Sequence, residues 1–263
     1  MFNSYFFLIV KDLKKNIVSE MLTQEIERET IKFLTNTSLE TSANTLNYKI
    51  IICIPAYNEE KNIVQVIKEI NTIMKRTNYN FKIIVLNDGS EDDTKKLALS
   101  NGAYVFSNKK NLGLADTFRN EMKICQKLKP DVIVHTDADG QYPAIYIPYM
   151  IRKVIEGYDL VLGSRFGRGI YSGRLSKKIG NLMFAKLFSI ILFKNIYDTT
   201  TGFRAFNQEV GSLPIKNKFT YTQEQLIRAI KAGKKVREVP IKARKTRNSK
   251  LFGNVFEYFL RVV

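Results

Sequence analysis

Residues 49–54 read KIIICI, and residues 55–59 read PAYNE. An unbroken apolar run of this kind is typical of a strand in a parallel sheet that is covered on both faces. Pro55 then ends the hydrogen-bond ladder, and the acidic residues Glu59 and Glu60 open a helix-length segment that extends to about residue 76. The stretch therefore predicts a β-strand followed directly by an α-helix.

The same alternation continues to about residue 163. Further strands are predicted over 81–86, 103–106, 132–136 and 159–163. Helices are predicted between them, over 92–100, 113–127 and 144–156. Strands separated by helices of this length predict an α/β fold, a single Rossmann-like domain whose largely parallel central sheet is flanked by helices. In such sheets, ligands bind outside the carboxyl ends of the strands.

Two carboxylates follow the strand predicted over 132–136. Asp137 and Asp139 are separated by one residue, and Gly140 and Gln141 come next. Mg²⁺ and Mn²⁺ prefer oxygen ligands and keep several waters, so two carboxylates and the oxygens of a bound phosphate complete the shell. The pair predicts a divalent cation shared with a diphosphate. A solvated turn is the alternative for such a pair taken alone.

A second polar motif follows the strand predicted over 81–86. Residues 87–90 read NDGS, and the acidic run at 91–93 opens the next helix. Gly89 permits a positive φ or a close approach of another backbone. Helix capping is the alternative to ligand contact for these side chains.

The charge of the chain is strongly unbalanced. Its 263 residues are 44% hydrophobic, enough for a packed core, and carry a formal net charge of +17. Residues 216–263 hold thirteen Lys or Arg against three Asp or Glu, whereas residues 1–48 hold five against six. Such an excess indicates nucleic acid, an anionic membrane or phosphorylated ligands. Nucleic acid is not predicted as a partner, because no nucleic-acid-binding motif is present and the acidic pair would repel a phosphate backbone.

Residues 1–48 are predicted to form an N-terminal extension, helical or partly disordered. The apolar run at 6–10 is followed at once by charges, which fits neither a membrane span nor a signal peptide. Cys53 and Cys125 are predicted to be reduced core thiols, which indicates a reducing, cytoplasmic setting. His135, the only histidine, is predicted to lie in the core or behind the ligands and not to bind metal.

Five motifs occur along the chain in one order: PAYNE at 55–59, NDGS at 87–90, DADGQ at 137–141, GSR at 163–165 and TGFR at 201–204. In this order they resemble the motifs of family 2 glycosyltransferases, in particular dolichyl-phosphate mannose synthases and other polyprenyl-phosphate sugar transferases. The resemblance covers residues 49–251. It implies a GT-A fold, a nucleoside-diphosphate-sugar donor, Mg²⁺ or Mn²⁺ as cofactor, and inversion at the anomeric carbon.

The resemblance also implies roles for individual residues. It implies that the nucleotide is bound by Pro55, Ala56, Tyr57, Glu59, Asp88, Asp137 and Ala138. Within this set, Asp88 is expected to accept a hydrogen bond from a ring N–H of the base. It implies that the cation and the diphosphate are surrounded by Asp137, Asp139 and Gln141. The chain departs from the family pattern at Asn87, where an aspartate is usual, and at Leu114, where a lysine is common.

A lipid monophosphate acceptor is mostly dianionic at neutral pH, so its oxygen attacks without a general base. The reaction then requires a cation held by catalytic Asp139 and bidentate arginines that overcome repulsion between two phosphorylated substrates. The arginine candidates are Arg165, Arg168, Arg174 and Arg204, of which Arg165 and Arg204 lie within the motifs and are predicted to be catalytic. In the family a later loop closes over the donor, which adds as phosphate-binding candidates Arg244, Arg247, Ser249 and Lys250.

A sugar hydroxyl as acceptor would require a carboxylate base. Glu224, at the start of a helix predicted over 223–231, is the candidate, with helix capping as the structural alternative. A transfer to a glycan hydroxyl is therefore the alternative reaction, and a non-catalytic sugar-nucleotide-binding membrane scaffold is the alternative from another class.

Two apolar segments favour the lipid acceptor. Residues 179–193 are too short to span a bilayer and are flanked by lysines, so they are predicted to lie in the membrane interface, with an ordinary buried helix as the alternative. Residues 252–263 are predicted to form a C-terminal juxtamembrane amphipathic helix beside a cationic loop that binds an anionic membrane surface. The chain is thus predicted to be peripheral on the cytoplasmic face and to transfer a sugar from GDP-mannose, UDP-glucose or UDP-N-acetylglucosamine to dolichyl or polyprenyl phosphate.

Overall fold

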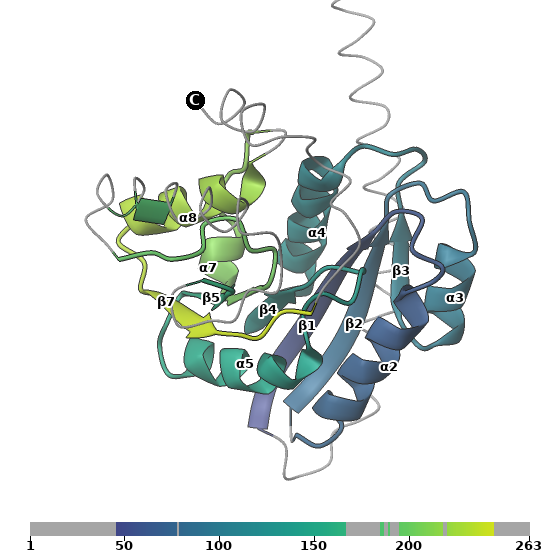
Figure 1. Cartoon of the computed structure of the whole chain (residues 1–263), viewed down its shortest axis with the longest axis horizontal. Coiled ribbons are helices and arrows are strands. Elements are labelled where there is room, and N and C mark those ends of the chain that lie inside the picture. Colours follow the sequence, from purple (N-terminus) through teal and green to yellow (C-terminus); the bar gives the residue numbers. More distant parts are fainter. Residues whose placement is uncertain are drawn as a thin grey trace, which may run out of the picture. The chain divides into compact units, whose positions relative to one another are not determined.

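The computed structural model describes residues 46–77, 79–166, 185–186, 189, 195–217 and 220–244 (Figure 1). In this part of the chain seven strands form one sheet in the order β3-β2-β1-β4-β6-β5-β7. The strands are β1 (Leu46–Ala56), β2 (Tyr79–Asn87), β3 (Tyr104–Ser107), β4 (Val132–His135), β5 (Leu160–Ser164), β6 (Arg204–Phe206) and β7 (Val236–Pro240). All neighbouring strands pair in parallel except β6, which is antiparallel to both β4 and β5.

Helices cover both faces of the sheet (Figure 1). One face is covered by α2 (Ile63–Met74), α3 (Thr94–Ser100) and α5 (Ile147–Ile155), with the 3₁₀-helix η1 (Ala144–Tyr146) leading into α5. The other face carries α4 (Leu114–Leu128) and the short α7 (Gln208–Gly211), while α8 (Tyr221–Lys231) precedes β7. None of these helices is both long and apolar enough to cross a bilayer.

The run at 49–54 forms the centre of the core. Ile50, Ile52 and Ile54 pack with the apolar faces of α2 and α5, and all three are fully buried. Cys53 lies against α4, where its sulfur is 3.7 Å from the sulfur of Cys125, and both cysteines are free and buried. The expected core thiols are therefore confirmed. Alternate side chains of β1 point to opposite faces of the sheet, and helices cover both faces. Both sets of side chains are therefore buried, which explains why no polar residue interrupts the run.

The five predicted strands are confirmed within a few residues at each end. The predicted helices are also present, although α2 starts at Ile63, four residues after the predicted Glu59. The delay arises because Asn62 N and Ile63 N both bond Glu59 O and form a turn first. Two strands, β6 and β7, were not predicted.

The predictions for residues 179–193 and 252–263 concern segments that, apart from residues 185, 186 and 189, lie outside the described residues. The same holds for the extension at 1–48, of which only the last three residues are described.

Replacement of Ile52 by alanine should lower the free energy of unfolding by about 2–5 kcal/mol, because the smaller side chain leaves a cavity at the centre of the core. Ile145→Ala removes the same atoms from a side chain that is 60% exposed, and its effect should stay within about 0.5 kcal/mol. Urea denaturation of the full chain, followed by circular dichroism, measures both changes. Equal losses for the two variants would contradict the central place of β1.

Candidate active site

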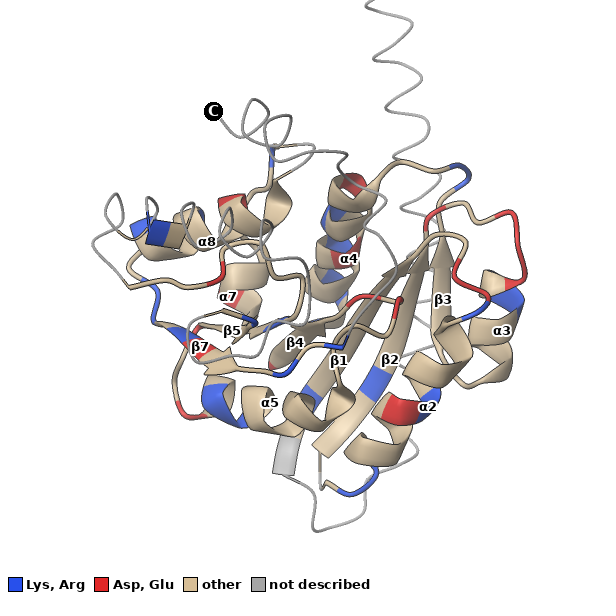
Figure 2. Ribbon diagram, viewed as in Figure 1, with Lys and Arg blue, Asp and Glu red and all other residues tan. Residues whose placement is uncertain are grey.

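The carboxyl ends of β1, β2 and β4 meet at one edge of the sheet. Parallel pairing places Ala56 beside Asn87 and Cys53 beside His135. A backbone hydrogen bond from Asp88 N to Ala56 O, at 2.8 Å, continues the alignment beyond β2. Acidic residues lie in the loops that follow all three strands (Figure 2). The structure therefore brings the motifs at 55–59, 87–90 and 137–141 to one edge, as the sequence predicted.

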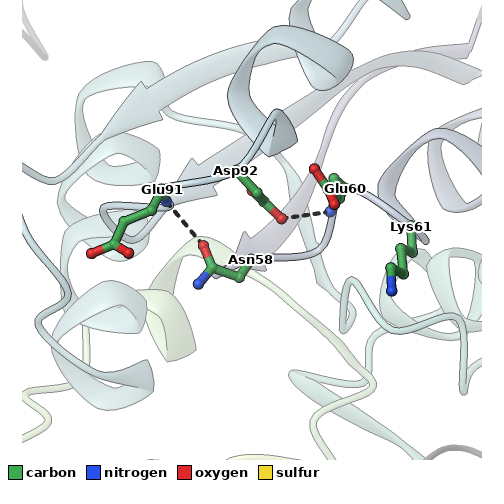
Figure 3. Close-up of a pocket in the computed structure, with 5 residues that line it drawn as sticks. All are labelled: Asn58, Glu60, Lys61, Glu91 and Asp92. Carbon is green, nitrogen blue, oxygen red and sulfur yellow. Dashed lines mark hydrogen bonds between the residues drawn. The ribbon is translucent and has the colours of Figure 1, made fainter.

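The loops after β1 and β2 are tied to each other. Asn58 N donates to Ser90 Oγ at 3.0 Å, and Glu91 N donates to Asn58 Oδ1 at 3.0 Å. Glu60 N donates to Asp92 Oδ2 at 3.1 Å. Between the loops lies an open pocket (Figure 3) that is lined by Asn58, Glu60, Lys61, Glu91 and Asp92. Its three carboxylates would repel a phosphate, so this pocket is suited to N–H and O–H groups of a ligand and not to a diphosphate.

The predicted nucleotide-binding residues of the first motif differ in exposure. Ala56 is 3% exposed and Glu59 is 8% exposed, whereas Tyr57 is 36% exposed. Glu59 is held in place, since its N–H donates to Thr94 Oγ1 at 2.8 Å and its Oε2 accepts from Asn62 Nδ2 at 2.7 Å. Pro55 and Ala138 are buried. Their contact with a nucleotide stays a prediction.

Asp88 anchors the loop at 108–113. Its Oδ1 accepts from Asn108 Nδ2 at 2.8 Å and from Leu112 N at 2.9 Å, and its Oδ2 accepts from Gly113 N at 2.9 Å. Gly89 is required here, because a Cβ would lie 2.5 Å from the carbonyl carbon of Lys110 in that loop. The sequence did not predict this anchoring role, and the bond from Asp88 to the base stays a prediction.

Asp137 and Asp139 form the candidate metal site. Burial, and then the charge of Asp139, raise the pKa of Asp137 to about 6. Asp139 Oδ1 accepts from Gln141 N at 2.9 Å, which folds the 139–141 turn around the carboxylate. In the described residues no group of three or more His, Cys, Asp or Glu is arranged so that it could hold a metal ion. Two neighbouring carboxylates still fit Mg²⁺ or Mn²⁺, which are commonly held by one or two carboxylates, water and substrate phosphate.

The motif at 201–204 packs directly against this site. A Cβ on Gly202 would lie 2.7 Å from Asp137 Oδ1, so only glycine leaves the carboxylate in its place. Gly202 N donates to the hydroxyl of Tyr142 at 3.3 Å, and the Tyr142 ring stacks on Phe203 with centroids 5.2 Å apart. The conformation of Asp137 therefore depends on a segment about sixty residues later in the sequence.

Arg165 is held by a buried ion pair. Its Nε lies 2.8 Å from Asp198 Oδ2, its Nη2 lies 3.0 Å from Asp198 Oδ1, and Nη2 also donates to Thr200 Oγ1 at 2.7 Å. The side chain of Asp198 is fully buried and that of Arg165 is 11% exposed. Asp198 was not predicted, and its role follows from the fold alone.

Arg204 is fully buried beneath the site. Its Nη1 donates to Thr222 O at 3.1 Å and to Gln225 Oε1 at 2.8 Å, and its Nη2 donates to Thr201 O at 2.5 Å. Burial lowers the pKa of Arg204. The guanidinium thus joins Thr201 to the first turns of α8 by hydrogen bonds. Its contact with phosphate stays a prediction.

The remaining predicted phosphate contacts divide into two groups. Arg244, which follows β7, pairs with Glu69 and lies beside the 139–141 turn. The others lie outside the described residues: Arg168, Arg174, Arg247, Ser249 and Lys250.

Glu224 stabilises a turn. Its Oε2 accepts from Lys216 N at 2.9 Å and Asn217 N at 2.7 Å, and its Oε1 accepts from Arg228 Nε at 2.8 Å. Burial acts to raise the pKa of Glu224, but the bonds from Asn217 and Arg228 outweigh it and leave the pKa below its usual value. These contacts are structural, but they hold the 216–217 turn and Arg228 and do not cap α8. The general-base role stays a prediction.

His135 is fully buried, as the sequence indicated. Its Nδ1 lies 2.8 Å from Glu121 Oε2, and its Nε2 lies 3.2 Å from the hydroxyl of Tyr221. Burial raises the pKa of Glu121. Neither partner was predicted, because α4 and α8 meet β4 only in the folded chain.

The fold and the site together define a GT-A glycosyltransferase. The model of the family named "Glycosyl transferase family 2" matches residues 51–211. The chain belongs to this family, which confirms the class expected from the motifs.

Two relatives and one solved structure illustrate the similarity. The chain is 33% identical over 187 residues to a dolichyl-phosphate hexose transferase of Haloferax volcanii, covering 70% of this chain and 78% of the relative. It is 31% identical over 232 residues to a dolichol-phosphate mannosyltransferase of Pyrococcus furiosus, covering 81% and 62%. Glucosyl-3-phosphoglycerate synthase from Mycobacterium tuberculosis, in complex with Mn²⁺, uridine diphosphate and phosphoglyceric acid, shares the fold with a TM-score of 0.64, 22% identity and coverage of 78% and 72%.

Gly202→Ala should weaken the binding of Mn²⁺ by about tenfold, because the new methyl group displaces the carboxylate of Asp137 from its position. Electron paramagnetic resonance of free Mn²⁺ measures the dissociation constant. Gly211→Ala is the control, since its Cβ would meet the side chain of Ile133 at 2.8 Å and not the site. Unchanged Mn²⁺ binding in the Gly202 variant would contradict the assignment of Asp137.

The stabilisation by Mn²⁺ should depend on pH. The pKa of Asp137 is raised to about 6 in the folded protein, whereas an aspartate in the unfolded chain has a pKa of about 4. Protonation of Asp137 therefore stabilises the metal-free fold. This contribution is complete below about pH 4 and is lost as pH rises through about 6. A cation competes with that proton. The increase in Tm with Mn²⁺ should therefore be larger at pH 7.5 than at pH 5, as differential scanning calorimetry can test. An equal increase at both values would contradict the expectation.

Proposed function

We propose that the protein transfers one sugar from a nucleoside diphosphate to the phosphate of dolichol or another polyprenol, with Mg²⁺ or Mn²⁺ as cofactor. The observation that carries the proposal is the pair Asp137 and Asp139 at the end of β4, where burial, and then the charge of Asp139, raise the pKa of Asp137. Such a pair is stabilised by a divalent cation, and a diphosphate supplies the remaining oxygens. The Mn²⁺ and uridine diphosphate named for the mycobacterial enzyme support this reading.

The lipid phosphate acceptor is supported by its ionisation at neutral pH and by the names of the Haloferax and Pyrococcus relatives. A phosphate dianion attacks the anomeric carbon without giving up a proton first, so no general base is needed. Glu224, the predicted base for a hydroxyl acceptor, already has both of its oxygens engaged in hydrogen bonds. The described site thus favours an acceptor that is ionised before it binds.

When bound, the cation would act as a Lewis acid and stabilise the charge on the departing diphosphate. Asp137 and Asp139 would hold it, with Gln141 beside them. Asp88 and the loops after β1 and β2 would bind the base and the ribose through their acceptor groups. Arg165, fixed by Asp198, would supply positive potential near the reacting phosphates without moving.

The protein would act as a peripheral enzyme on the cytoplasmic face of an anionic membrane. The support is the excess of Lys and Arg over 216–263 and the apolar character of residues 179–193 and 252–263. GDP-mannose, UDP-glucose and UDP-N-acetylglucosamine remain as donors to be compared.

The test is transfer of radiolabelled sugar from these donors into organic-extractable polyprenyl phosphate by the full chain, with Mn²⁺ or Mg²⁺ present. Label in the lipid phase should require the cation and should fall by about a hundredfold or more in Asp139→Asn, because a carboxylate that stabilises the transition state through the cation is lost. Asp131→Asn is the matched control, since Asp131 lies just before β4, at the opposite end of the strand.

Each outcome is informative. Donor turnover without lipid product would move the proposal to a glycan hydroxyl acceptor, and Glu224→Gln would then abolish turnover. Donor binding without turnover under any condition would identify a non-catalytic scaffold.

A further inference from the structure

Glu69 lies on α2, outside all five motifs, and contacts two segments beside the candidate metal site. Its Oε1 accepts from Ala144 N at 3.0 Å and from Arg244 Nη2 at 2.8 Å. Its Oε2 accepts from Arg244 Nη1 at 2.7 Å. One carboxylate thus joins α2 to the start of η1 and to the chain after β7.

Arg244 continues these contacts to the 139–141 turn. Its backbone N–H donates to Gln141 O at 2.9 Å, and its Nη1 lies 3.4 Å from Gly140 O. Gln141 N in turn donates to Asp139 Oδ1 at 2.9 Å. A continuous series of hydrogen bonds therefore runs from Glu69 through Arg244 and Gln141 to the carboxylate of Asp139.

The turn is held on both sides by this arrangement. Ala144, three residues after Gln141, is fixed by Glu69 directly, and Gln141 is fixed through Arg244. Gly140 also lies over α2, since a Cβ there would be 3.8 Å from Val66. The segment 139–144 therefore contacts α2 at several points. Glu69 makes the one contact among these that involves a charged side chain.

We propose that Glu69 is a positioning residue of the cation site, which holds the 139–141 turn so that Asp139 is oriented for a divalent cation before the cation binds. This inference rests on the cation site of the proposed function. Glu69 does not touch the cation and acts through Arg244 and the backbone of the turn.

Stability alone does not account for the arrangement. The Glu69 and Arg244 side chains are 25% and 45% exposed, and an ion pair that is open to solvent contributes little to stability. The same bonds can still affect cation affinity, because residues that orient metal ligands typically change affinity by about 10–100-fold when removed. The two roles therefore predict different measurements.

The test is the dissociation constant of Mn²⁺, measured by electron paramagnetic resonance on the full chain with and without uridine diphosphate. Glu69→Ala should weaken Mn²⁺ binding by about tenfold with little change in Tm. Glu69→Gln keeps an acceptor for Ala144 N but loses the ion pair, so its affinity should fall between those of the wild type and Glu69→Ala.

A double-mutant cycle tests the route through Arg244. Glu69→Ala should weaken Mn²⁺ binding less in an Arg244→Ala background than in the wild type, because the two residues act as one unit. Glu156→Ala is the matched control. Glu156 also forms exposed ion pairs, with Arg152 and Lys153, and its loss should leave Mn²⁺ binding unchanged.

The outcomes separate this inference from the proposed function. The inference would be overturned if the Mn²⁺ dissociation constants of Glu69→Ala and Glu69→Gln both lay within twofold of the wild-type value, even if sugar transfer is observed. Mn²⁺ binding that depends on Glu69, in a protein that transfers no sugar, would support the inference and reject the transferase proposal. A wild-type chain that fails to bind Mn²⁺ in either condition would overturn the inference and the proposed cofactor together.

Discussion

The burial of Asp137 beside a second carboxylate is the constraint on which the rest of the site depends. A buried carboxylate is costly to ionise, and the charge of Asp139 adds to that cost, so the pKa of Asp137 is raised. The surrounding residues fix the geometry without neutralising the charge. Gly202 leaves room for one carboxylate, and Gln141 N–H orients the other. A divalent cation bound between the two carboxylates would offset the cost of ionising both of them.

The described arginines near this site differ in how freely they can move. Arg165 pairs in a bidentate manner with the fully buried Asp198, and removal of one partner of a buried pair typically costs about 3–5 kcal/mol. Arg204 is bound to three protein acceptors in the core. Arg244 forms an exposed pair that is much weaker. Fixed positive potential therefore comes from Arg165 and Arg204, whereas Arg244 is held by a pair that is open to solvent.

Much of the fold could be predicted from the sequence, because long apolar runs and amphipathic periodicity determine the first five strands and their helices. β6 could not, since it has three residues and carries Arg204 at its first position. β7 reads VREVP, and its two adjacent charges and its terminal proline give no strand pattern. The paired carboxylates were predicted from their spacing. The roles of Glu69, Asp198 and Glu121 were not, because each depends on a contact between segments far apart in the sequence.

Helix α8 connects this arrangement to the choice of acceptor. Tyr221, its first residue, bonds His135 at the end of β4, and Thr222 and Gln225 bond Arg204 on β6. Glu224 holds the turn at 216–217. Tyr221, Thr222 and Gln225 thus tie α8 to β4 and β6, whereas Glu224 ties it to the turn that precedes the helix. Glu224 is the one carboxylate among these groups, so in the proposed reaction a hydroxyl acceptor would need it to leave the 216–217 turn and act as the base, whereas an ionised phosphate would need no base. The hydrogen bonds of α8 therefore agree with the phosphate acceptor that we propose.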